Sequence, residues 1–283
     1  MLALPEPPPF KMTAAPLVQA LVQVNFPIVP RLQTLEGVAS VQEALAGKFP
    51  YLSQNFVQQM SLMVGPAGPA APQTAQQVVH ELTSDEGWAL TLTVSSASLS
   101  VGVEYAGVDD FADRFSEICS ALSRAGGVAR CDRLGVRYVD VVEIGNDDNE
   151  GWSQWFRPEI IGVAAPALSG DVLLSSLTET RLQQQPPDGP FEALQSPIEG
   201  MLRHGVVPAG SVLVGLPPRP IEQRAFVFDM DTSVTSPQPF DAEILAEQYR
   251  ALHAGIEKVF HWAVTAEGKV RFGYEPTEGV DQR

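Results

Sequence analysis

The sequence of 283 residues predicts an α+β protein in which mainly antiparallel sheets are covered by amphipathic helices. Three observations support this fold class. Apolar residues make up 45% of the chain and charged residues 18%, which is typical of a globular protein. Segments that alternate apolar and polar residues are joined by short turns, as in antiparallel sheets. Segments with a helical apolar stripe follow these strands and could cover one face of a sheet.

The first half of the chain is expected to run from strands into a helix and a closing strand. Its expected elements are an irregular proline-rich arm at 1–16, a strand at 18–26, a helix at 35–48, a strand at 54–64, a three-stranded meander at 77–105, a helix from 109 and a long strand at 131–144. Asp109 or Asp110 is a suitable N-cap for the second helix, and Gly126-Gly127 is a suitable end. Its apolar stripe would cover the meander.

The second half partly repeats this order. Its expected elements are a short helix at 152–156, strands at 172–184, 206–214 and 225–234, and a long helix from about 241 with Asp241 as its N-cap. The buried stripe of that helix is expected to hold Leu245, Tyr249, Leu252, Ile256, Val259 and Ala263. The order suggests two similar halves, at 17–150 and 151–283, packed as one unit, although no residue-level repeat accompanies it.

Charge and composition narrow the range of partners. The chain holds 34 acidic and 18 basic residues, for a net charge of −16, which disfavours direct binding to nucleic acid and favours a basic protein partner. No apolar stretch is long enough to span a membrane, and the N-terminus lacks the pattern of a signal peptide. We therefore expect a cytoplasmic protein whose two cysteines, Cys119 and Cys131, are buried, reduced thiols.

One segment resembles a catalytic motif. Asp229 and Asp231 follow an apolar strand, and this pattern is similar to the first motif of haloacid-dehalogenase-like phosphatases, in which one carboxylate attacks phosphorus beside Mg²⁺. That family places the motif on the first strand of a parallel domain, whereas here the preceding chain is expected to be antiparallel. Two aspartates on the solvent face of an alternating strand are the favoured interpretation, so no catalytic residue is assigned.

No metal or cofactor site is expected, because three patterns that resemble one each lack a necessary feature. His80 begins a near match to H-E-x-x-H, but Ser84 replaces the second histidine and the segment is a strand. The loop that begins at Asn146 resembles a calcium loop, but Arg157 occupies the position of the bidentate glutamate. His253 and His261 would lie about 12 Å apart along their helix, too far to share an ion.

Three arginines form the only candidate binding site. Arg133 and Arg137 point to one face of the strand at 131–144, and Arg181 lies in the middle of a strand in the second half. The guanidinium group binds carboxylate or phosphate well, so these residues could line a pocket for a small anion. The alternative, which we favour, is internal pairing with a carboxylate of Asp140, Glu143 or Glu179, because acidic residues outnumber basic ones.

Two short motifs resemble a sporadically distributed, uncharacterised bacterial protein family of about this length. They are P-L-V-Q-A-L-V-Q-V-N-F at 16–26 and R-L-G-V-R-Y-V-D-V-V-E-I at 133–144. The chain departs from the family pattern at Gln19, where glutamate is favoured, and at Asp140, where asparagine is usual. The resemblance implies one α+β unit without an established activity, and its scattered distribution would fit accessory or defence-related genes.

Three functional hypotheses remain open. The first is a non-enzymatic interaction factor, such as an inhibitor, immunity or antitoxin-like protein, which turns an acidic surface towards a basic partner. The second is a binding protein for a small anion near Arg133, Arg137 and Arg181. The third is a magnesium-dependent phosphatase that uses Asp229 and Asp231. The sequence assigns neither the oligomeric state nor the identity of the partner.

Overall fold

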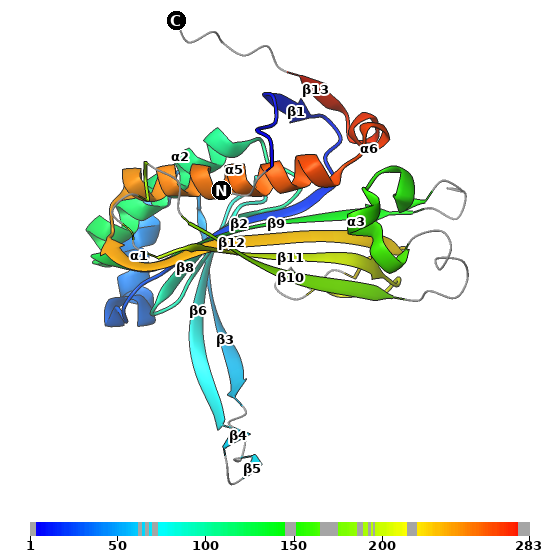
Figure 1. The fold of residues 1–283 in the computed structure, drawn as a ribbon. Coiled ribbons are helices and arrows are strands. Elements are labelled where there is room, and N and C mark those ends of the chain that lie inside the picture. Colours follow the sequence, from blue (N-terminus) through cyan, green and yellow to red (C-terminus); the bar gives the residue numbers. More distant parts are fainter. Residues whose placement is uncertain are drawn as a thin grey trace, which may run out of the picture. The chain divides into compact units, whose positions relative to one another are not determined.

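The computed structural model describes residues 4–61, 64–65, 68–69, 73–144, 151–164, 175–185, 189–191, 194, 196–213 and 220–276, with the backbone alone at 58–61, 64–65, 68–69 and 73–75. The fold is α+β with antiparallel sheets and packed helices, as the sequence predicted (Figure 1). The chain divides into two compact units: unit 1 comprises Met1–Leu21, Gly135–Thr235 and Glu247–Arg283, and unit 2 comprises Val22–Leu134 and Ser236–Ala246.

These bounds differ from the consecutive halves at 17–150 and 151–283. Each unit is assembled from separated segments, because strands β2 (Leu17–Asn25), β9 (Arg130–Glu143) and β12 (Ala225–Pro239) each continue from one unit into the other. A structural duplication stays a prediction.

Unit 1 contains the strand order β10-β11-β12-β9-β2, in which β10–β11 and β11–β12 pair antiparallel. Its remaining elements are β1 (Phe10–Met12), η3 (Trp152–Gln154), α3 (Pro158–Ile161), η4 (Gly162–Ala164), β10 (Ser176–Gln184), β11 (Ile198–Val207), most of α5 (Ala242–Ala263), α6 (Ala266–Arg271) and β13 (Tyr274–Pro276). The N-terminal segment at 1–16, expected to be irregular, contains a short strand, because β1 pairs with β13. The strand expected at 206–214 lies earlier: β11 ends at Val207, where Pro208 has no N–H to continue the ladder.

The core of unit 1 lies on both faces of β12. Phe226, Phe228 and Met230 are buried on one face, and the ring of Phe156 lies 4.8 Å from that of Phe226. Ala225 and Val227 are buried on the other face, in a cluster with Val139 and Ile221.

All six residues expected on the buried stripe of α5 are buried. Asp241 Oδ1 accepts hydrogen bonds from the N–H groups of Glu243 and Ile244, which confirms the predicted cap.

Unit 2 contains the strand order β2-β8-β7-β6-β3, with antiparallel pairs from β3 to β8. Its elements are η1 (Pro30–Gln33), α1 (Leu35–Leu45), β3 (Tyr51–Ser61), β4 (Val64–Gly65), β5 (Gly68–Pro69), β6 (Gln73–Thr83), β7 (Ala89–Leu92), β8 (Ser96–Val101), α2 (Val108–Ala121) and the π-turn η2 (Leu122–Gly126). The predicted meander is confirmed, but its last strand ends at Val101 rather than 105, and Val103 is 78% exposed.

Helix α2 covers the meander with the predicted apolar stripe of Phe111, Phe115, Ile118 and Leu122, all of which are buried. The ring of Phe111 lies 5.2 Å from that of Trp88. The predicted cap is wrong, because Gly107 occupies the N-cap position without a side-chain hydrogen bond. Asp109 and Asp110 lie in the first turn instead, where a carboxylate is favoured by the helix dipole.

Two further expectations can be compared with the described residues. Cys119 and Cys131 are both buried free thiols, as predicted. Within the described ranges, no helix is long and apolar enough to cross a membrane.

Candidate functional site

The end of unit 2's sheet narrows to a two-stranded ribbon. Strands β3 and β6 pair along their whole length, from Tyr51 opposite Thr83 to Ser61 opposite Gln73. Strand β7 pairs only with His80–Thr83 of β6. Residues 55–61 and 73–79 therefore continue beyond the sheet as a ribbon, which we call the arm, and Figure 1 shows β3 and β6 leading to the short β4–β5 pair.

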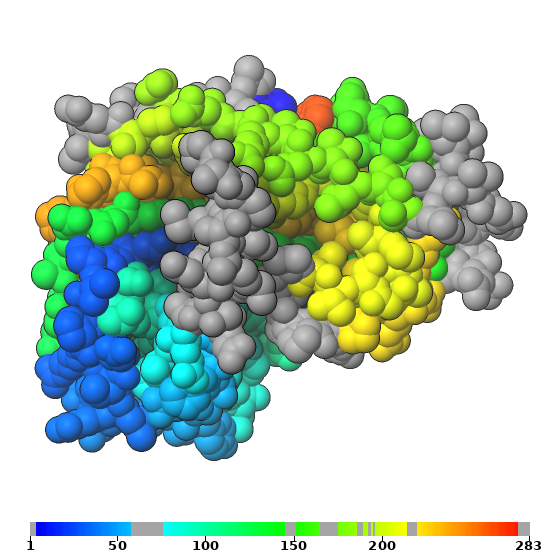
Figure 2. All heavy atoms as spheres, turned by 90° about the horizontal axis from the view of Figure 1, so that it is seen from below, coloured from blue at the N-terminus to red at the C-terminus, as the bar shows by residue number. Residues whose placement is uncertain are grey.

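Apolar side chains of the arm are exposed on both of its faces. Phe56 is 60% exposed and Val57 is 45% exposed, and neighbouring strand residues point to opposite faces. Asn55 and Gln76 are also exposed, whereas Val78 is half-buried. In Figure 2 the described side chains of β3 and β6, in light blue and cyan, lie at the surface beside those of α1 in blue. A hairpin with both faces in water is marginally stable, which favours a partner that covers it.

The arm lies in the longest stretch of the chain without charge. Between Phe49 and His80 there is no Asp, Glu, Lys or Arg, although the whole chain carries 34 acidic and 18 basic residues. Natural sheet edges are usually protected against pairing by charged side chains, prolines or bulges. Strand β3, the last strand of unit 2's order, contains neither a charge nor a proline.

The outermost strand of unit 1 differs from β3 in this respect. Strand β10 carries Glu179 and Arg181, and the Arg181 side chain is 82% exposed. Charges on an edge strand oppose the approach of a second strand, because pairing would desolvate them. The contrast with β10 identifies the edge of β3 as suited to strand addition.

The candidate arginines of unit 1 belong to a row of ion pairs across four strands. Arg137 of β9 donates to both carboxylate oxygens of Asp229 on β12, at 2.8 and 2.9 Å. Arg203, directly opposite Asp229 on β11, lies 3.4 Å from the same carboxylate and 3.0 Å from that of Glu179 on β10. Arg181 completes the row at 3.2 Å from Glu179.

This row bears on the choice between an anion site and internal pairing, the interpretation that the sequence favoured. Arg137 and Arg181 are both engaged by carboxylates within unit 1, and Glu179 was among the expected internal partners. Asp229 was not, and it is the partner that binds Arg137. Arg133 lies on the part of β9 that belongs to unit 2, so the structure does not bring all three arginines into one described site. The geometry is that of internal charge neutralisation.

Asp140 lies near this row and is only 7% exposed. Burial, followed by the nearby charge of Asp229, raises the pKa of the Asp140 carboxyl to about 8. The carboxyl is therefore mostly protonated at neutral pH. The neutral Asp140 carboxyl group therefore lies beside Asp229, which Arg137 binds.

The phosphatase-like motif lies in a different environment from the one its chemistry requires. Asp229 was expected on a solvent face, but it is 5% exposed and bound by Arg137, so that expectation is wrong. Its strand β12 pairs antiparallel with β11. Within the part of the chain that the structure describes, no group of three or more His, Cys, Asp or Glu residues could hold a metal ion.

The histidines of the rejected metal patterns are packed among aromatic or apolar groups. His80 lies on a strand, as predicted, and burial lowers the pKa of its imidazole. The rings of His253 and Tyr138 are 5.0 Å apart, and those of His261 and Phe10 are 5.7 Å apart. Residues 146–150 of the Asn146 loop lie outside the described residues, whereas 151–157 lie within them.

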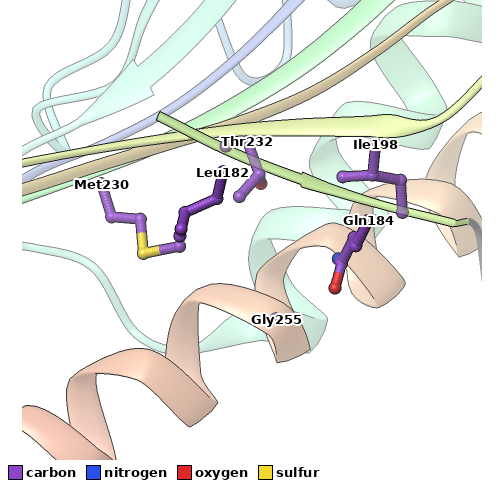
Figure 3. A pocket seen from close by; sticks show the side chains of 7 residues that line it. Leu182, Gln184, Ile198, Met230, Thr232 and Gly255 are labelled. Atoms are coloured by element: carbon purple, nitrogen blue, oxygen red, sulfur yellow. The ribbon is translucent and has the colours of Figure 1, made fainter. Parts of the chain in front are cut away.

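A small pocket lies in unit 1 between the sheet and α5 (Figure 3). It is partly open to solvent and has a cavity volume of about 20 Å³, and its described lining is Leu182, Gln184, Ile198, Gly200, Met230, Thr232 and Gly255. The lining is mainly apolar and includes none of the three candidate arginines. This pocket is therefore not the predicted anion site.

Comparison with known proteins adds no family to this description: no family model matches the chain, and no curated protein matches it. The resemblance carried by the motifs at 16–26 and 133–144 stays a prediction. Sequence reasoning assigned a strand at 54–64 but did not predict that it would extend beyond the sheet as an exposed arm. The absence of charge from 49 to 80 was the signal that could have identified it.

Proposed function

We propose that the protein is a non-enzymatic protein-interaction factor whose docking element is the β3–β6 arm. The observation that carries this proposal is the exposure of Phe56 and Val57 on opposite faces of a ribbon without a single charge. Exposed strand edges bind other chains by strand addition, in which main-chain hydrogen bonds give affinity and alternate side chains give specificity. An inhibitor, immunity or antitoxin-like role fits such a docking element.

The acidic remainder of the chain supports a basic protein partner. A net charge of −16 speeds encounter with a positively charged surface and suppresses binding to phosphate backbones. Charge steering and strand pairing, the two proposed contributions to binding, differ in their response to salt. Charge steering weakens as ionic strength rises, whereas strand pairing along an uncharged edge is little affected.

The two alternative functions have less support in the described geometry. An anion would have to displace Asp229 from Arg137, or Glu179 from Arg181 and Arg203. A phosphatase would need Asp229 free to attack phosphorus, but this carboxylate accepts two hydrogen bonds from Arg137. The row of charges therefore supports a structural role for these residues.

A capture experiment tests the proposal. Purified wild-type protein, the arm variant Val57→Lys and the control Val103→Lys would be immobilised and exposed to native lysate at low and high salt. Val103 is exposed but lies outside the arm, so it controls for the added charge. We expect a basic protein to be retained by the wild type and the control, and lost with Val57→Lys.

The competing outcomes are equally clear. Retention of the same protein by Val57→Lys would show that the arm is not the docking element. Absence of any partner at both salt concentrations would contradict the interaction role itself.

A further inference from the structure

We infer that the outer edge of β3, with which no described strand pairs, binds the β3 strand of a second copy of this chain, antiparallel across a two-fold axis at Phe56. This inference rests on the proposed function, because it takes the arm as the docking element, and it names a second copy as the occupant of the β3 edge when the basic partner is absent. Isologous pairing occupies the β3 edge of both copies, so this contact closes as a dimer and does not propagate.

The first argument is the nature of the edge. Strand β3 is the last strand of unit 2's order, and its outer edge runs from Tyr51 to Ser61, about 33 Å at 3.3 Å per residue. None of its residues is charged, and none is a proline. Edges of this kind pair with other strands unless something blocks them. Strand β10 offers the contrast, because pairing along it would desolvate Glu179 and Arg181, which already pair with each other within the chain.

The second argument is electrostatic. Two chains that each carry −16 repel each other, and charges in solution interact over about 8 Å at physiological salt. Self-association is therefore favoured only where contact places no carboxylate opposite another carboxylate. The uncharged stretch from Phe49 to His80 meets this condition, and it coincides with the exposed arm.

The third argument is the position of Phe56. It is the middle residue of β3, so full antiparallel overlap places Phe56 of one copy directly opposite Phe56 of the other, and Val57 opposite Asn55. Directly opposed residues have Cβ atoms about 5 Å apart, which suits an aromatic pair. Phe56 is 60% exposed in the single chain, so pairing would cover an apolar ring that otherwise faces water.

The symmetry of this arrangement gives a sharp test. Phe56→Asp places two negative charges opposite each other at the axis, and Phe56→Lys places two positive ones. Each variant alone should raise the dimer dissociation constant about tenfold or more, whereas an equimolar mixture should restore a mixed dimer with an opposed Asp–Lys pair. Sedimentation velocity of the full chain measures the masses, and Val103→Asp serves as the control.

Circular dichroism first establishes that each variant is folded, and the exposure of Phe56 makes this the expected result. A monomeric wild type at every concentration, unaltered dimers of both variants, or a mixture that stays monomeric would each overturn the inference. Failure here is separable from failure of the proposed function. If the wild type is monomeric but captures a lysate partner that the Val57→Lys variant does not capture, self-pairing alone is overturned.

Discussion

Arg137 of β9 donates two hydrogen bonds, of 2.8 and 2.9 Å, to the two carboxylate oxygens of Asp229 on β12. The two side chains are 16% and 7% exposed, so both charges are largely removed from water. A bidentate pair fixes the relative orientation of both groups as well as their distance. Arg203 then links Asp229 to Glu179, so that charges of alternating sign follow one another across the strands of unit 1.

The first prediction concerns the loss of this pair. Arg137→Met retains much of the side-chain volume but leaves Asp229 buried with only the longer contact to Arg203 that the structure shows. Removing one partner of a buried ion pair leaves the other charge buried and uncompensated, so we expect the free energy of unfolding to fall by about 3 kcal/mol. Urea denaturation followed by circular dichroism measures the change.

Arg181→Ala is the matched control, because its side chain is 82% exposed and pairs with Glu179 at the surface. An exposed pair contributes about 0.5 kcal/mol or less, so this variant should unfold close to the wild type. Equal effects of the two substitutions would show that burial of the Arg137 pair does not matter for stability.

The second prediction concerns pH. The pKa of Asp140 is raised from 3.8 to about 8 by burial and by the charge of Asp229. Between these two values the unfolded chain releases the proton and the folded chain keeps it, so stability falls as pH rises. The contribution of this group is fully present below pH 4, and it is lost at about 1.4 kcal/mol per pH unit until pH 8.

Asp140→Asn removes this dependence while keeping the shape of a protonated carboxyl group. We expect the variant to be more stable than the wild type by a few kcal/mol at pH 8, with the difference shrinking towards pH 4. Urea midpoints across this range give the comparison, and Glu275→Gln, at a side chain 53% exposed, is the control. A pH-independent difference would mean that Asp140 does not carry the shift.

The regular elements were predictable because their burial is periodic. The α5 stripe and the alternation of Phe226 and Phe228 follow directly from spacing, since each residue's face is decided by its position in the repeat. Element ends were less predictable. A β-strand ended at Val101 although Val103 continues the alternation, and Gly107 rather than an aspartate occupies the cap of α2. Local competition among neighbouring groups decides such ends.

The charged row could not be read from the sequence for a different reason. Arg137 and Asp229 are 92 residues apart, and only strand order and register bring them together. Spacing placed both aspartates of the phosphatase-like motif on one face, but it could not show that Arg137 would meet Asp229 there. The arm is the opposite case. The absence of charge is visible in the sequence, and only the exposure of Phe56 and Val57 required the structure.

The third prediction concerns the thiols. Cys119 and Cys131 are buried, and burial raises the pKa of Cys131 to about 12 and that of Cys119 well above its ordinary value. The thiolate is the reactive form, so neither residue should react with a disulfide reagent at pH 8 in the folded protein. Both should react in guanidinium chloride. Val103→Cys adds an exposed thiol, so one thiol per chain of this folded variant should react rapidly. Rapid reaction of the folded wild type would contradict the burial of Cys119 and Cys131.

The fourth prediction contrasts two glycines within helices. Gly255 of α5 lines the small pocket, and a Cβ added there would meet no atom within 4 Å. Gly268 of α6 is enclosed, because the same addition would lie 2.9 Å from the Cα of Trp155 and 2.7 Å from Cγ1 of Val264. Helix propensity favours alanine at both positions by about 1 kcal/mol, so packing decides the sign of each change.

We therefore expect Gly255→Ala to raise the free energy of unfolding by up to about 1 kcal/mol, since it gains helix propensity without a clash. Gly268→Ala should lower it by about 2 kcal/mol, because the backbone of Trp155 cannot move aside as a flexible side chain would. Thermal unfolding of the two variants against the wild type measures both. Destabilisation by Gly255→Ala would mean that the space beside α5 is occupied in solution, and a binding assay on the pocket of Figure 3 would then be the next step.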